Sequence, residues 1–103
     1  IRQISMEKFK ILVELTFYPK EIIGRDRKYS NNYRPAFKIR EDMFNSGQIN
    51  FIDRMEVSSG ESHVRAFVVF PYKQLLINSI HKGKIFTFGE GTKVLGEGIV
   101  IKK

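Results

Sequence analysis

The sequence predicts an all-β domain, a closed antiparallel barrel of six strands with Greek-key connections. First, the length of 103 residues fits one domain with one core. Second, apolar residues alternate with polar ones in several segments, which places them on one face of a strand. Third, most connections between these segments are short, and closing the sheet would remove its exposed edges. We interpret residues 6–103 as this domain. Residues 1–5 are interpreted as a leader or linker, because Met6 would serve as a natural start; an internal Met in a longer chain is the alternative.

The first half of the chain predicts two strands separated by a long loop. From Phe9 to Phe17 every odd position is apolar, so one face of this strand belongs to the core. Residues 19–32 are rich in charge, Gly and Asn, which is typical of a loop. A second strand is expected over residues 35–40.

The second half predicts three further segments before the C-terminal hairpin. Residues 49–57 alternate again, with Met55 among the inward positions and Asp53 breaking the pattern, and a turn follows at residues 58–60. Residues 63–70 are apolar on both faces near their end, as in a strand that is covered from both sides. Pro71 ends this strand because it cannot donate a backbone hydrogen bond. Residues 73–80 are expected to form one or two helical turns.

The chain closes with two strands, over residues 84–88 and 94–101, joined by a tight turn at Glu90 and Gly91. The glycines of this region, at positions 89, 91, 96 and 98, are interpreted as turn and bend residues. A phosphate-binding glycine loop needs a strand that leads into a helix, and the sequence predicts no helix after them.

Composition argues against several classes of function. The chain has no cysteine, and no apolar run approaches the roughly 20 residues of a membrane helix. Its first residues do not resemble a secretion signal, so we expect a cytoplasmic protein without a membrane partner. His63 and His81 stand alone, and the acids form no paired or triad pattern. We therefore expect no metal, no small-molecule cofactor and no enzymatic activity.

The formal net charge of +7 favours an acidic partner such as RNA, with solubility as the plain alternative. Basic and aromatic residues alternate within one short window, in which only Asp26 is acidic. This window is a candidate basic patch, and its members are Arg25, Arg27, Lys28, Tyr29, Tyr33, Arg34, Phe37, Lys38 and Arg40.

Several motifs resemble the third domain of translation elongation factor Tu. Asn-Tyr-Arg-Pro-Ala-Phe at positions 32–37 is similar to the Gly-Tyr-Arg-Pro-Gln-Phe of that family. It stands in register with Gly-Gln-Ile at 47–49 and with Gly-Glu-Gly at 89–91, the last hairpin of the family domain. The resemblance covers about residues 8–103 and implies a β-barrel that helps to hold the T-stem of aminoacyl-tRNA.

The resemblance also implies particular RNA contacts. Arg25 matches a loop arginine suited to a phosphate, and Glu90 with Gly91 matches the turn whose acidic side chain accepts a hydrogen bond from RNA. Ser46 roughly matches a threonine that meets the RNA backbone. Two departures weaken the tRNA interpretation, because the family has Gln at the position of Ala36 and His at that of Asp26. The complete expected RNA surface comprises Arg25, Arg27, Lys28, Arg34, Ser46, Glu90 and Gly91.

Three alternatives stay open. Arg34 and Pro35 are typical of a strand entrance as well as of an RNA contact. In the second alternative, the chain is a protein-binding module, such as a mimic of the elongation factor domain, an immunity-type protein or a translation regulator. That module would use an apolar surface with Phe67, Val69 and Tyr72. In the third alternative, the chain is the C-terminal piece of a longer translational GTPase.

Overall fold

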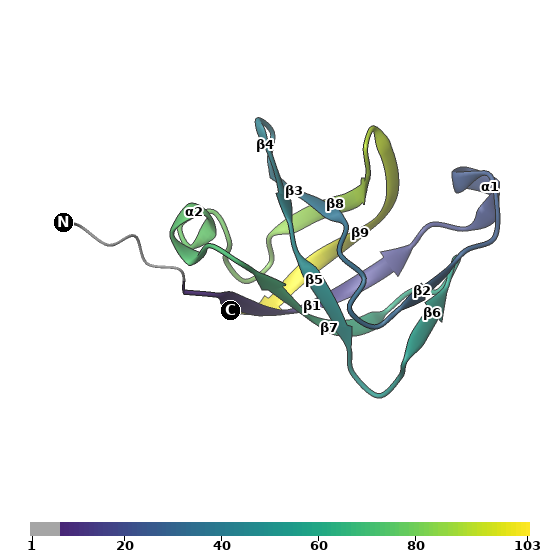
Figure 1. Cartoon of the computed structure of the whole chain (residues 1–103), viewed down its shortest axis with the longest axis horizontal. Helices are drawn as coiled ribbons and strands as arrows, with labels where there is room; N and C mark the ends of the chain where they lie inside the picture. The colour runs from purple at the N-terminus through teal and green to yellow at the C-terminus, as the bar shows by residue number, and fades with distance from the viewer. Residues whose placement is uncertain (1–6) are drawn as a thin grey trace.

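A computed structural model describes residues 7–103, which fold around one antiparallel sheet (Figure 1). Seven strands form this sheet in the order β4-β3-β8-β9-β1-β7-β5, and β2 and β6 pair in a small separate ribbon. The expected leader, residues 1–5, lies outside the described residues. The strands are β1 (Phe9–Phe17), β2 (Lys28–Ser30), β3 (Ala36–Arg40), β4 (Met43–Ser46), β5 (Gln48–Phe51), β6 (Glu56–Ser58), β7 (Val64–Phe70), β8 (Ile85–Glu90) and β9 (Lys93–Lys102).

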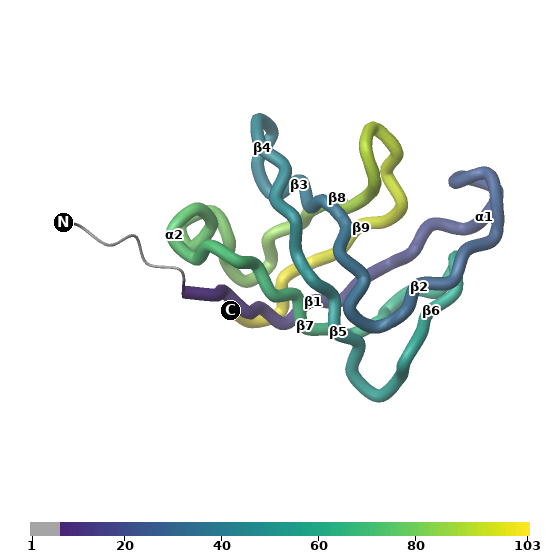
Figure 2. Tube along the Cα trace, viewed as in Figure 1, coloured from purple at the N-terminus to yellow at the C-terminus, as the bar shows by residue number. Residues whose placement is uncertain are grey.

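Strand β1 is an inner strand of the sheet, which pairs with β7 on one side and with β9 on the other. Its odd residues are at most 6% exposed, as the alternation predicted, and they are Phe9, Ile11, Val13, Leu15 and Phe17. The sheet curls around this face, as the trace in Figure 2 shows. Aromatic rings fill the enclosed space, and the centroids of Phe17 and Phe88 lie 5.2 Å apart. The core therefore sits inside the curl.

Gly47 is the single residue between β4 and β5. On one side of it β4 pairs with β3, and on the other β5 pairs with β7. A Cβ atom at Gly47 would lie 2.8 Å from Cε1 of Phe70 and 3.0 Å from Cε2 of Phe37, so a side chain here would displace these buried rings. The Gly47 amide donates to the Pro35 carbonyl at 3.2 Å and the Ile49 amide to the Tyr33 carbonyl at 2.8 Å, so the pairing with the entrance of β3 continues from β4 through Gly47 into β5.

The structure confirms the all-β, antiparallel character of the domain and shows a sheet curled into a half-barrel. The first strand and the C-terminal hairpin lie where they were expected. The turn itself is formed by Gly91 and Thr92, with Glu90 and Lys93 paired across it, so it is one residue later than expected. A closed barrel of six strands stays a prediction.

Two segments differ from expectation. The expected loop at residues 19–32 contains the short helix α1 (Lys20–Ile23) and strand β2, whose central residue Tyr29 is buried opposite Val57. The expected strand over residues 49–57 is wrong as a single element. Asp53 has a φ of 69°, which turns the chain between β5 and β6, and Met55 is 75% exposed instead of inward.

The helical segment after Pro71 is shorter than expected. Helix α2 (Lys73–Leu76) is one turn long, and it buries Leu76. Ile80 follows in a loop and is also buried. Within residues 7–103, no helix is long and apolar enough to cross a bilayer.

Candidate functional site

The turn between β8 and β9 holds its shape through two glycines. Gly91 has a φ of 59° and occupies the first central position of the two-residue turn, where hairpins of this kind favour glycine. At Gly89 a Cβ atom would overlap the carbonyl oxygen of Lys93 and lie 3.0 Å from Cα of Val94. The strands approach so closely here that only glycine fits. The result is a narrow turn that carries Glu90 at its base.

The Glu90 carboxylate is held by side chains from two distant segments. Arg27, in the connection between α1 and β2, donates from Nη1 to Oε1 at 3.1 Å and from Nη2 to Oε2 at 2.9 Å. Tyr33, just before β3, donates its hydroxyl to Oε2 at 2.5 Å. A forked guanidinium contact of this type fixes both the position and the orientation of a carboxylate. Glu90 is thus oriented although its side chain is 48% exposed.

These contacts set the ionisation of the cluster. The hydrogen bond from Arg27, followed by that from Tyr33, holds the pKa of the Glu90 carboxyl below its ordinary value. Burial, followed by the hydrogen bond to Glu90, raises the pKa of the Tyr33 hydroxyl far above its ordinary value. The bond to Glu90 also raises the pKa of Arg27. At neutral pH the cluster therefore contains an anion, a cation and a neutral hydroxyl, and its net charge is zero.

Two basic side chains beside this cluster remain available. Arg25 is exposed in the same connection as Arg27, and its positive charge contributes to the lowered pKa of Glu90. Nζ of Lys93 lies close to Gly24, where a Cβ atom would be 3.9 Å away from it. Neither Arg25 nor Lys93 makes an ion pair with another of the described residues. We call Arg25, Arg27, Tyr33, Glu90, Gly91 and Lys93 the hairpin site.

The other residues expected to bind RNA lie elsewhere. Lys28 pairs with Glu56 at 3.8 Å on the small ribbon, and Arg34 donates to the Gln48 side chain at 3.3 Å. Ser46 is exposed on β4 opposite Ala36, and Ala36 is in turn opposite Gly89. Ser46 therefore lies in the same row across the sheet as Gly89 of the β8-β9 hairpin, but strand β3 separates it from β8. The structure brings together Arg25, Arg27, Glu90 and Gly91 of the predicted set.

The aromatic residues of the basic window belong mainly to the core. Tyr29 and Phe37 are 1% and 0% exposed, so neither offers a ring face on which a base could stack. The Arg27 guanidinium lies over the Tyr29 ring, 5.0 Å from its centroid. Tyr33 is partly buried and directs its hydroxyl to Glu90. The basic and aromatic residues thus do not form the mixed surface that their sequence pattern predicted.

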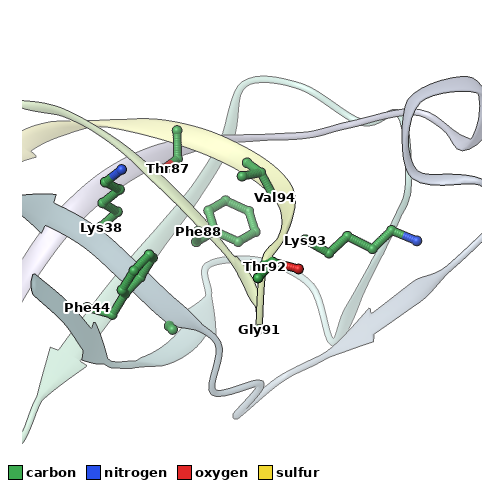
Figure 3. A pocket seen from close by; sticks show the side chains of 10 residues that line it. Lys38, Phe44, Thr87, Phe88, Gly91, Thr92, Lys93 and Val94 are labelled. Atoms are coloured by element: carbon green, nitrogen blue, oxygen red, sulfur yellow. The ribbon is translucent and has the colours of Figure 1, made fainter. Parts of the chain in front are cut away.

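A depression of about 320 Å³ lies next to the turn, between the β3-β4 and β8-β9 hairpins (Figure 3). Phe44, Phe88 and Val94 contribute apolar groups to it, and Lys38 and Lys93 are among the residues that line it. Sequence reasoning missed Phe44 and Lys93. Lys93 could have been predicted from its position next to the expected turn. The alternation of apolar and polar residues does not indicate that Phe44 is exposed, although its exposed fraction is 62%.

The three residues expected to bind a protein lie on β7 and just after it. Phe67 and Val69 are half-buried on the outer face of β7, with Nζ of Lys10 4.3 Å from the Phe67 ring centroid. Tyr72 is 42% exposed and lines a second depression, of about 290 Å³, together with Phe44 and Leu75. Neither Phe67 nor Val69 lines that depression.

No protein-family model matches the sequence, and a search of curated proteins finds no match either. Over residues 7–103, no group of three His, Cys, Asp or Glu side chains could hold a metal ion. The fold and the hairpin site define an all-β domain with an oriented carboxylate and, in the same region, two cations without an ion-pair partner among the described residues.

Proposed function

We propose that this chain is a non-catalytic RNA-binding domain related to the third domain of elongation factor Tu, and that it binds structured RNA, with tRNA as the first candidate. One observation carries the proposal. The Glu90 carboxylate is fixed at a hairpin by Arg27 and Tyr33, and Arg25 and Lys93 in the same region have no ion-pair partner among the described residues.

The chemistry of these groups suits the backbone and the shallow groove of RNA. Arg25 and Lys93 have no carboxylate to give up, so each can contact a phosphate without breaking an ion pair. Glu90 is already neutralised by Arg27, which lowers the cost of bringing it near phosphates. Its fixed oxygens can accept a hydrogen bond from a ribose 2′-hydroxyl or a base amino group, a contact by which RNA is distinguished from DNA.

Two structural observations support the relation to elongation factor Tu. Tyr33 belongs to the Tyr-Arg-Pro motif and Glu90 to the Gly-Glu-Gly motif, and these two side chains hydrogen-bond to each other. In addition, β4 and β5 can be counted as the halves of one strand joined at Gly47, which reduces the sheet to six strands. The bridge between Tyr33 and Ile49 then supports closure into a barrel.

The proposal is tested by titrating fluorescently labelled tRNA with the chain at several salt concentrations between about 50 and 200 mM. We expect Arg25→Ala and Lys93→Ala each to weaken binding and to reduce the slope of log K against log salt by about one. Lys82→Ala is the matched control, because Lys82 is exposed in the loop before β8, at the end of that strand remote from Glu90. Unchanged slopes in both test variants, or no tRNA binding, would overturn the proposal.

A further inference from the structure

Strand β4 has an open edge. It pairs with β3 only, and it is the terminal strand of the sheet. The ladder between β5 and β7 ends at Gln48 and Val69 and does not continue along β4. Pro71 follows β7 and has no amide hydrogen to offer. Within the described residues, no strand pairs with the outer edge of β4, and such an edge is a template for another strand.

The second depression lies along this open edge. Its lining includes residues 44–46 of β4 and residues 70–72 at the end of β7, with α2 behind them. Phe70 and Leu76 are buried at its base, whereas Phe44, Tyr72 and Leu75 are 62%, 42% and 50% exposed. Its volume of about 290 Å³ could receive one large apolar side chain. An unpaired strand edge and an apolar pocket thus occur side by side.

Charge favours a partner with acidic residues over a second copy of this chain. Two copies would bring together two molecules of net charge +7, which repel each other. Lys38, whose Nζ lies 5.9 Å from the centroid of the Phe44 ring, is on β3 and therefore on the paired side of β4, so the preference for an acidic partner comes from the net charge of the chain.

We infer that the outer edge of β4 binds an extended, acidic segment of a partner protein as an additional strand, with one aromatic or leucine side chain in the depression beside Phe44. Backbone hydrogen bonds would supply affinity, and the depression would select the side chain, as in other cases of strand addition. This function goes beyond RNA binding, because Arg25, Glu90 and Lys93 do not line this depression.

The probe is a synthetic octapeptide, blocked at both ends, in which aspartate alternates with phenylalanine or valine. It is titrated into the isotope-labelled chain and followed by NMR. We expect amide shifts in β4 and in residues 72–76, and about tenfold weaker binding in Phe44→Ser. Ile22→Ser is the matched control, since Ile22 is 66% exposed on α1 and should not affect binding.

Two altered peptides test the mode of binding. N-methylation of alternate residues removes the amide hydrogens on one side of a strand, so one methylated set should lose binding and the other should keep it. Replacing the aspartates by lysines should weaken binding severalfold. The inference is overturned by absence of binding at about 1 mM peptide, by equal effects of the two methylated sets, or by unchanged binding in Phe44→Ser. A concentration-dependent dimer that Phe44→Ser abolishes would also overturn it, because a second copy would then occupy the edge.

Discussion

Replacing Gly89 by alanine tests whether the hairpin site depends on close approach of its two strands. The added Cβ would overlap the Lys93 carbonyl oxygen and lie 2.9 Å from the Lys93 carbonyl carbon, and both are backbone atoms. A flexible side chain could move aside, but here the strand itself must move. Overpacking of a well-packed site costs about 1–3 kcal/mol, and we expect the upper end, about 3 kcal/mol. For a domain of this size, that lowers Tm by roughly 12–24 °C.

Gly91→Ala is the matched control, because it adds the same methyl group two residues away. No atom lies within 4 Å of the added Cβ, so its cost is only that of the positive φ, about 1–2 kcal/mol. The two variants are compared by urea denaturation, with NMR to monitor the contact between Arg27 and Glu90. Gly89→Ala should be the less stable by at least about 1 kcal/mol and should lose that contact. Equal stability of the two variants would refute the reasoning.

Three further predictions concern Gly47 and the carboxylate cluster around Glu90. Gly47→Ala should lower the free energy of unfolding, measured by urea denaturation, by about 1–3 kcal/mol, because the added Cβ would meet the rings of two buried phenylalanines. A variant as stable as the parent would contradict this crowding. Tyr33→Phe should cost about 1 kcal/mol and raise the pKa of the Glu90 carboxyl measured by NMR, because it removes a hydrogen bond to the ionised form; an unchanged pKa would argue against this bond. Finally, the pKa of the Glu90 carboxyl in the folded chain lies below the ordinary value of 4.5. The contribution of Glu90 to the free energy of unfolding is therefore complete above pH 4.5, and it is lost as the pH falls through the lowered pKa. Glu90→Gln should therefore flatten the acid denaturation profile below about pH 5; identical acid profiles would contradict it.

The long regular strands could be predicted from alternation, and the short ones could not. In β1, nine residues give enough repeats of the two-residue period to define a buried face. Strand β2 has three residues, of which only Tyr29 is buried, so its polar neighbours made the segment look like a loop. Met55 was misplaced because the positive φ of Asp53 turns the chain, and alternation does not carry across such a turn.

The candidate site was predicted only as far as short motifs allowed. Arg25, Glu90 and Gly91 lie in one region, as their positions in the two matched motifs implied. The pairing of Arg27 with Glu90 spans 63 residues of sequence, and no local pattern indicates it. Phe44 is an exposed aromatic residue, and a strand with mixed faces gives no signal that separates such a residue from one in the core.

The ion pairs decide how many of the basic residues can take part in RNA binding without reorganisation. Arg25 and Lys93 have no acidic partner among the described residues, whereas Lys28, Lys38 and Arg40 each contact a carboxylate at the surface. If RNA meets the hairpin site alone, these two cations give a salt slope of magnitude about two. Surface pairs are worth about 0–1 kcal/mol, so phosphates can replace their carboxylates. A slope nearer five would therefore mean that the three paired cations also contact RNA, and that the interface extends from the hairpin across β3 to the small ribbon.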